Sequence, residues 1–137
     1  MMGIKEKIEQ IAAKYGLQII YAFGSRAKEA KEVVEGRMER LSYTRSDLDI
    51  GIKPERPLTI EEKVEIAIFF EDQLHLPRVD VVLLPEAPVS LAAEIVLGEI
   101  LYTSDPTYEA EYQLYILRMA ADLFPHEQTK QKMILGA

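Results

Sequence analysis

Two stretches decide the fold of this chain: LQIIYAFGS at residues 17–25 and SDLDIGIK at residues 46–53. Each contains an apolar run of the length of a β-strand. Asp47 and Asp49 are two residues apart, so on a strand both carboxylates project from one face. Two like charges about 4 Å apart repel by roughly 4 kcal/mol at an effective dielectric of about 20, so the pair favours a bound divalent cation. The alternative, two aspartates in an exposed β-turn, leaves the apolar flanks unexplained.

Asp80 adds a third carboxylate. It lies within VDVVLL, residues 79–84, an apolar and β-branched run that is typical of a buried strand. An unpaired charge buried there is costly and needs a cation, hydrogen bonds or solvent. If this strand lies beside that of Asp47 and Asp49, three carboxylates converge, and such hard oxygen ligands suit Mg²⁺ or Mn²⁺. For Asp80 alone, capping by backbone amides at a strand end is an equal alternative.

Gly24 and Ser25 follow the first apolar run directly. Glycine lets the backbone turn and approach a ligand closely. If a helix begins after Ser25, its first N–H groups face an anion, and Arg26 adds a donor fork suited to phosphate. A Gly-Ser pair alone is weak evidence, but a pair that precedes Asp-x-Asp on one strand and a lone Asp on another is far more specific.

The combination of Gly24-Ser25-Arg26-Ala27, Ser46-Asp47-Leu48-Asp49 and Asp80 resembles the signature of the nucleotidyltransferase superfamily of the DNA polymerase β type. The chain is most similar to its minimal, single-domain members, the MNT-type proteins. The likeness extends from Leu17 to about Asp105. All three carboxylates are intact, which argues against an inactive copy.

The resemblance implies a function. ATP is the expected substrate. Its AMP would be transferred to a hydroxyl, expected to be that of a tyrosine of a partner HEPN-domain toxin, so that the protein acts as an antitoxin. Two Mg²⁺ ions, with Mn²⁺ as an alternative, are the expected cofactors. The family pattern assigns metal binding and catalysis to Asp47, Asp49 and Asp80, and nucleotide binding to Gly24, Ser25, Arg26, Arg45 and Ser46.

Two other functions remain open. One is transfer of a nucleotide to a small molecule, as in aminoglycoside-modifying enzymes, although those usually carry a second domain for the acceptor. The other is an antitoxin that acts by binding alone, without catalysis.

The segment 28–45 is longer than the family's usual loop before Ser-Asp-x-Asp and is rich in charges of both signs. We interpret it as a solvated helical extension with i,i+4 pairs. The alternative is a lid or substrate-guiding hairpin beside the triphosphate, in which Arg45 would touch phosphate.

Composition is consistent with this assignment. The 137 residues, 48% of them hydrophobic, predict one domain over 1–137, with a catalytic core at about 17–105. No apolar run reaches transmembrane length and there is no cysteine, so we expect a cytoplasmic protein without disulfides. The net charge of −7 speaks against extended nucleic-acid binding.

Alternating helical and strand patterns predict an α/β fold, a small mixed sheet with helices over one face. Strands are expected at 17–23, 47–53, 79–84 and 99–103. A long helix is expected at about 106–124, ended by Pro125. On this helix Leu114, Leu117, Ala121 and Phe124 form a predicted core face, whereas Tyr108, Tyr112, Tyr115 and Met119 form a second face suited to a toxin or a homodimer. Ordinary core packing of the tyrosines is an equal alternative.

Overall fold

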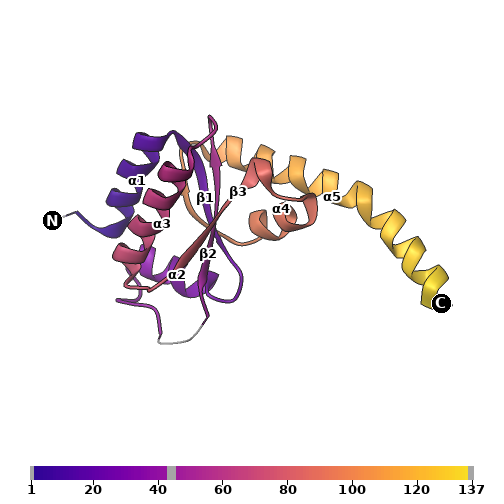
Figure 1. The fold of residues 1–137 in the computed structure, drawn as a ribbon, viewed down its shortest axis with the longest axis horizontal. Coiled ribbons are helices and arrows are strands. Elements are labelled where there is room, and N and C mark those ends of the chain that lie inside the picture. The colour runs from indigo at the N-terminus through magenta and orange to yellow at the C-terminus, as the bar shows by residue number, and fades with distance from the viewer. Residues whose placement is uncertain (1, 43–45, 136–137) are drawn as a thin grey trace.

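A computed structural model of the chain describes the backbone of residues 2–42 and 46–135, and side chains as far as residue 123. Helices and strands alternate along the chain (Figure 1). The strands are β1 Leu17–Phe23, β2 Leu48–Pro54, β3 Val79–Leu83 and β4 Glu99–Thr103, and the helices are α1 Ile4–Tyr15, α2 Ala27–Val34, α3 Ile60–Leu74, the short 3₁₀ turn η1 Leu84–Glu86, α4 Val89–Val96 and α5 Pro106–Leu135.

The strands form one mixed sheet in the order β3-β2-β1-β4. β1 is antiparallel to both β2 and β4, whereas β2 and β3 are parallel. Parallel strands begin at the same edge of a sheet, and an antiparallel neighbour ends there. The end of β1 and the beginnings of β2 and β3 therefore meet at one edge. The predicted fold class, with its mixed sheet, is confirmed.

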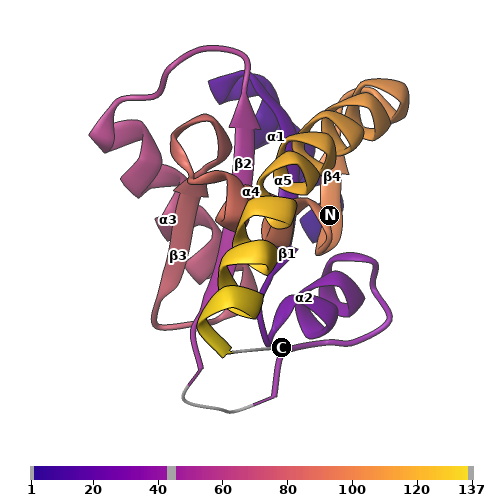
Figure 2. The same cartoon turned by 90° about the vertical axis from the view of Figure 1, so that its right-hand side faces the viewer.

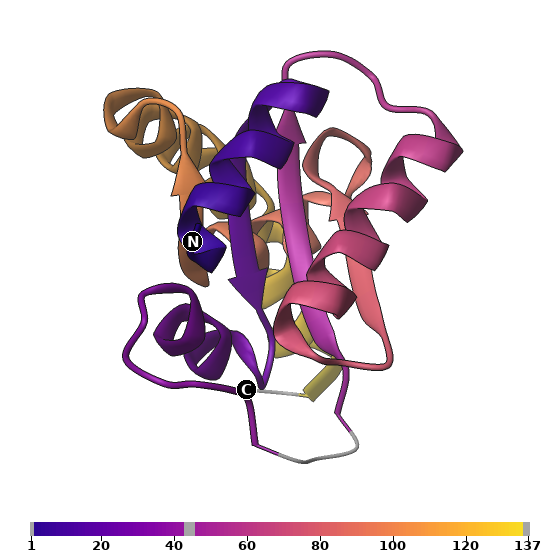
Figure 3. The ribbon, with the colours of Figure 1, turned by 90° about the vertical axis from the view of Figure 1, so that its left-hand side faces the viewer.

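Helices cover both faces of the sheet, which corrects the prediction that they pack over one face. One hydrophobic core lies between the sheet and α1, α2 and α3, and the other lies between the sheet and α4 and α5 (Figures 1 and 3). The reason is visible in β1, where every residue except Gln18 is buried. A strand that is apolar on both faces needs cover on both, and alternation of apolar and polar residues cannot reveal it.

The last helix is longer than predicted. α5 runs from Pro106 to Leu135 and continues through Pro125, where the sequence predicted its end. Proline inside a helix removes one backbone hydrogen bond, but most residues that follow it are good helix formers. In Figure 1 the C-terminal half of α5 extends well beyond the sheet. Within residues 2–42 and 46–135, no helix is both long and apolar enough to cross a membrane.

The packing of α5 also differs from the prediction. Ile116 and Ala120 are buried against the domain, whereas Leu114, a predicted core residue, is 54% exposed and Ala121 is exposed. The core face of α5 was predicted wrongly because the helix has apolar residues on two faces, and their spacing does not show which of the two is buried. The buried face is centred on the small and β-branched residues, which allow α5 to pack closely against α4.

The predicted tyrosine face is partly used within the chain. Tyr112 and Met119 are half-buried and line a pocket of about 420 Å³, and Lys53 Nζ lies 5.8 Å from the centroid of the Tyr112 ring. Tyr108 stacks on Tyr112, with 6.2 Å between ring centroids. Only Tyr115 of the four is mainly exposed, at 58%.

Candidate active site

The register of the sheet brings two of the predicted carboxylates together. Asp49 of β2 is paired with Asp80 of the parallel strand β3, and on its other side it is paired with Phe23 of β1. Leu48 and Ile50 point into the core under α1 to α3, so Asp49 points to the opposite face. The predicted adjacency of these two strands is therefore present in the structure.

Gly24 completes this arrangement. Its backbone has φ of +81°, in the left-handed region that glycine adopts readily. A Cβ atom at this position would lie 2.8 Å from Asp49 Oδ2, closer than side chains tolerate. Glycine is thus needed both for the turn after β1 and for room beside the Asp49 carboxylate. Gly24 and Ser25 are both exposed, so the turn is accessible to a ligand.

Asp47 lies just outside the strand on which it was predicted, because β2 begins at Leu48. Its contact with the other carboxylates is made through Arg78. Arg78 Nε lies 3.2 Å from Asp80 Oδ1 and 3.8 Å from Asp47 Oδ2. The guanidinium therefore bridges Asp47 and Asp80 as an internal counterion.

The site carries an excess of negative charge. Partial burial raises the pKa of Asp49, and the charges of Asp80, Asp47 and Glu94 raise it further. Among the described residues, no hydrogen-bond donor or cation pairs with the Asp49 carboxylate. Glu94 of α4 was not found by sequence reasoning. A carboxylate that is crowded by other carboxylates and left without a donor is a position that favours a bound cation.

The residues fit a divalent cation in their chemistry. Three aspartates from the start of two neighbouring strands supply hard oxygen donors. In the described part of the chain, however, no group of three His, Cys, Asp or Glu side chains is already arranged as a metal site. The contacts of Arg78 explain this arrangement, because its guanidinium lies between the Asp47 and Asp80 carboxylates. A metal ion bound by both carboxylates would have to displace the guanidinium in part.

Arg26, predicted to bind the nucleotide, makes contacts within the chain itself. Its side chain is only 3% exposed, and its guanidinium donates hydrogen bonds to the backbone carbonyls of Ser42 and Ser46, the latter at 3.1 Å. It also lies 3.6 Å from the Glu29 carboxylate. The fork is therefore engaged by the protein itself and fixes the segment that leads to Asp47, and the Arg26 side chain also lines a pocket beside Asp47.

The segment 28–45 is helical only as far as Val34, where α2 ends. The predicted i,i+4 pairing is present between Lys31 and Glu35, at 3.0 Å. Ser46 is exposed beside Asp47, as its predicted role requires, whereas Arg45 lies outside the described residues.

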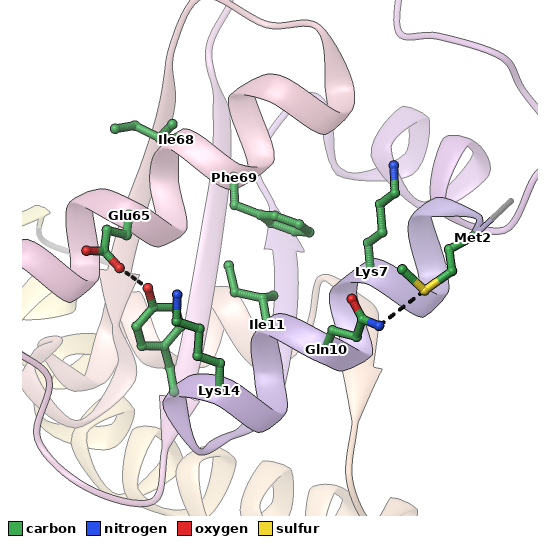
Figure 4. Close-up of a pocket in the computed structure, with 9 residues that line it drawn as sticks. Met2, Lys7, Gln10, Ile11, Lys14, Glu65, Ile68 and Phe69 are labelled. Atoms are coloured by element: carbon green, nitrogen blue, oxygen red, sulfur yellow. Dashed lines mark hydrogen bonds between the residues drawn. The ribbon is translucent and has the colours of Figure 1, made fainter.

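The two larger pockets on the side of α1 to α3 flank these helices. The larger, about 580 Å³, lies between α1 and α3 with Ile11 and Phe69 in its wall and is lined by none of the predicted site residues (Figure 4). The second, about 500 Å³, is lined by Asp47, Arg26 and Arg78 among others. The second pocket is therefore the candidate site, because its lining residues, and not its volume, have the chemistry that the site requires. Arg78 could have been found from the sequence, because it immediately precedes the apolar run 79–84 and lies two residues before Asp80.

Comparison with known proteins follows this geometry. A family model described as polymerase beta, nucleotidyltransferase matches residues 6–107. This range includes every residue of the candidate site. No functionally curated protein matches the chain significantly.

Solved structures share the fold over nearly the whole chain. One chain of a toxin-antitoxin MntA-HpeT mutant matches with a TM-score of 0.68 and 20% identity, over 96% of this chain and 98% of that chain. A toxin-antitoxin structure with AMP-PNP gives 0.67 and 22%, over 96% and 98%. A structure of the tri-AMPylated Shewanella oneidensis HEPN toxin in complex with MNT antitoxin gives 0.66 and 21%, over 96% of each chain. At this level of identity the likeness concerns the fold.

Proposed function

Because the chain belongs to the nucleotidyltransferase family of the DNA polymerase β type, we propose that it transfers AMP from ATP to a hydroxyl of a partner HEPN toxin and so acts as its antitoxin. The observation that carries the proposal is the meeting of Asp49, Asp80 and the exposed Gly24 turn at one edge of the sheet. Carboxylates beside an open backbone turn suit metal-assisted phosphoryl chemistry, in which positioning and charge stabilisation do most of the catalysis.

Asp47, Asp49 and Asp80 would hold the divalent cations, which we propose to be two Mg²⁺ ions, with Mn²⁺ as the alternative. When bound, the cations neutralise phosphate charge and lower the pKa of the attacking hydroxyl. Asp49 contributes most, since its carboxylate has no donor among the described residues, and burial together with the neighbouring carboxylates raises its pKa.

The chain's own residues orient the substrate. Gly24 has no side chain, so the backbone of the turn can approach the triphosphate closely, and Ser25 adds an exposed hydroxyl. The first N–H groups of α2 follow the turn, where the helix dipole favours negative charge. Arg26 is a positioning residue, because its bonds to the carbonyls of Ser42 and Ser46 hold the approach to Asp47.

For the acceptor we propose a tyrosine of a HEPN toxin in the cytoplasm, where ATP is available. The support is the likeness to chains from structures described as MNT antitoxin with a tri-AMPylated HEPN toxin. On α5 the exposed apolar residues Leu114, Tyr115 and Leu123 offer a docking surface, since the other predicted tyrosines pack partly against the domain. A homodimer that uses the same face is the competing occupant.

The test is transfer from ATP labelled in its α-phosphate, with Mg²⁺, into a lysate of the source cell. We expect label on one discrete small protein with the wild-type chain and none with Asp47→Asn. The matched control, Asp72→Asn, removes an exposed carboxylate of α3 outside the site and should transfer as the wild type does. Label in small molecules alone would support the aminoglycoside-type alternative, and toxin neutralisation by Asp47→Asn would support an antitoxin that acts by binding alone.

A further inference from the structure

The pocket of about 580 Å³ between α1 and α3, here called the α1–α3 groove, has no role in the function proposed above. It lies on one face of the sheet, whereas Asp49 points to the opposite face, which α5 covers (Figure 3). Ile11 of α1 and Phe69 of α3 are half-buried in its wall and point toward one another (Figure 4). A partner in the groove and a nucleotide beside Asp49 would therefore not compete for space.

An exposed apolar stripe of α3 continues from the groove. Ile60, Val64 and Ile68 follow one another at intervals of four residues, so they lie on one face of the helix. They are 78%, 50% and 48% exposed, and Ile68 also lines the groove. A surface helix usually presents polar residues to solvent, whereas α3 presents aliphatic ones here. Such a continuous apolar surface is typical of a site that binds another protein.

The charged residues of the groove favour an acidic partner. Lys7 and Lys14 of α1 line it, and neither makes an ion pair within residues 2–42 and 46–135. Lys14 Nζ lies over the ring of Tyr15, 5.2 Å from its centroid. The acidic residue of the lining, Glu65, already accepts a hydrogen bond from the Tyr15 hydroxyl. The groove is therefore rimmed by positive charge on a chain whose net charge is −7.

The form of the groove favours a helical occupant. Two helices border it, and an amphipathic helix that lies along them would bury its apolar face, as in other helix-in-groove complexes. Lys7 and Lys14 are seven residues apart, which is about 10 Å along α1. Two carboxylates seven residues apart on the occupant would have the same separation and would lie on one face of it.

We propose that the α1–α3 groove binds an acidic amphipathic helix of a partner protein. The apolar residues of this helix would cover Ile11, Ile68 and Phe69, and two of its carboxylates would pair with Lys7 and Lys14. The inference does not rest on the proposed function, because the groove lies across the sheet from the candidate active site and from α5. It gives the chain a partner surface that is separate from the one on α5.

The test is selection from a displayed library of helical peptides 15 residues long, the length of α3. All members carry leucine at the positions of one apolar face, and two flanking positions seven residues apart are varied among glutamate, glutamine and lysine. We expect the wild-type chain to enrich glutamate at both positions, and Lys7→Glu/Lys14→Glu to enrich lysine. Enrichment of lysine by the wild type, the same peptides on both proteins, or no binding peptide at all would overturn the inference.

Fluorescence anisotropy of the selected glutamate peptide then measures its affinity for single variants. Ile68→Ser should weaken binding about tenfold and Lys7→Gln/Lys14→Gln about fivefold, through lost apolar burial and the loss of two exposed ion pairs. The matched controls are Leu97→Ser, a 65% exposed leucine at the end of α4, and Lys28→Gln, an exposed lysine of α2 outside the groove. Both should bind the peptide as the wild type does.

Equal affinity of Ile68→Ser and the wild type would overturn the inference. A dimer of the free chain in analytical ultracentrifugation that Ile68→Ser converts to a monomer would do so as well, because a second copy would then occupy the groove. Circular dichroism checks that Ile68→Ser keeps its fold. The two lysine variants change only side chains at the rim of the groove, so they test the charge pairing even if Ile68→Ser is unstable.

Discussion

Two carboxylates on the same face of the sheet, the face seen in Figure 2, have opposite surroundings. Glu109 of α5 is 6% exposed and accepts a hydrogen bond of 2.6 Å from the hydroxyl of Tyr21 on β1. Asp49 of β2 is half-buried, and no donor reaches it among the described residues. A buried charge that is satisfied within the chain is structural, whereas one that is crowded by like charges requires a ligand.

The electrostatics follow the same division. Burial, and then the hydrogen bond to Glu109, raise the pKa of Tyr21 above its usual value, so the phenol remains a donor at all physiological pH. For Asp49, burial and the neighbouring Asp80 raise the pKa as well, but this disfavours the charge that a cation site needs. The first arrangement is complete without a ligand, and the second is not.

The largest expected effect comes from removing the unsatisfied charge. Asp49→Asn should lower nucleotide transfer by at least about 100-fold, since even indirect partners of metal ligands cost about 10- to 100-fold. The free energy of unfolding should stay the same or rise, because a repelling charge is lost. Rates with labelled ATP, Mn²⁺ binding by calorimetry and thermal unfolding measure the three quantities.

The same measurements on Asp72→Asn, an exposed aspartate of α3, provide the control. Unchanged transfer or unchanged Mn²⁺ affinity in Asp49→Asn would contradict the distinction between the two carboxylates.

The satisfied pair should respond in the opposite way. Tyr21→Phe removes the donor and leaves the Glu109 carboxylate buried without a partner, which we expect to cost about 1–3 kcal/mol of stability. Transfer per folded molecule should change little. Denaturant unfolding measures this loss of stability. The double variant Tyr21→Phe/Glu109→Met should recover much of it, because removing both polar partners leaves no buried polar group without a hydrogen bond. A double variant no more stable than Tyr21→Phe would show that the hydrogen bond is not the cause.

The sequence predicted the unsatisfied site far better than the satisfied one. Asp49 and Asp80 stand out because aspartate is rare in strands. Their convergence was predicted on the condition that the two strands are neighbours, which the sheet register shows them to be. The strand bounds at Leu17–Phe23 and Glu99–Thr103 were correct for the same reason, since short apolar runs with clear ends mark them.

Glu109 could not be recognised in this way. From the sequence alone, a glutamate on a helix is expected to face solvent. Glu109 is instead buried through a contact with Tyr21, which lies 88 residues earlier in the chain. The exposed Leu114 and the double covering of the sheet were missed for a related reason, since both depend on which face of α5 meets the domain. Likewise, Arg26 has the chemistry of a phosphate ligand, and only tertiary contacts with Ser42 and Ser46 show that it is engaged elsewhere.

The smallest expected effect is a pH dependence of stability that originates at Asp49. Folding raises the pKa of this carboxyl above its usual value of 3.8, so the folded state binds the proton more tightly than the unfolded state does. Its favourable contribution is therefore present below the usual pKa and is lost as the pH rises through the raised one. In the metal-free protein, the wild type should therefore lose stability relative to Asp49→Asn as the pH rises from below 3.8 through the raised pKa.

This difference should remain below about 1 kcal/mol, because Asp49 is only partly buried and solvent screens its charge. Denaturant unfolding of both proteins at several pH values measures it, with Asp72→Asn expected to follow the wild type. Addition of Mn²⁺ should reverse the sign above the raised pKa, since the ionised carboxylate then gains a ligand that Asp49→Asn binds poorly. A constant difference between the two proteins at every pH would mean that Asp49 is solvated like any surface carboxylate, and the contrast with Glu109 would then lose its electrostatic basis.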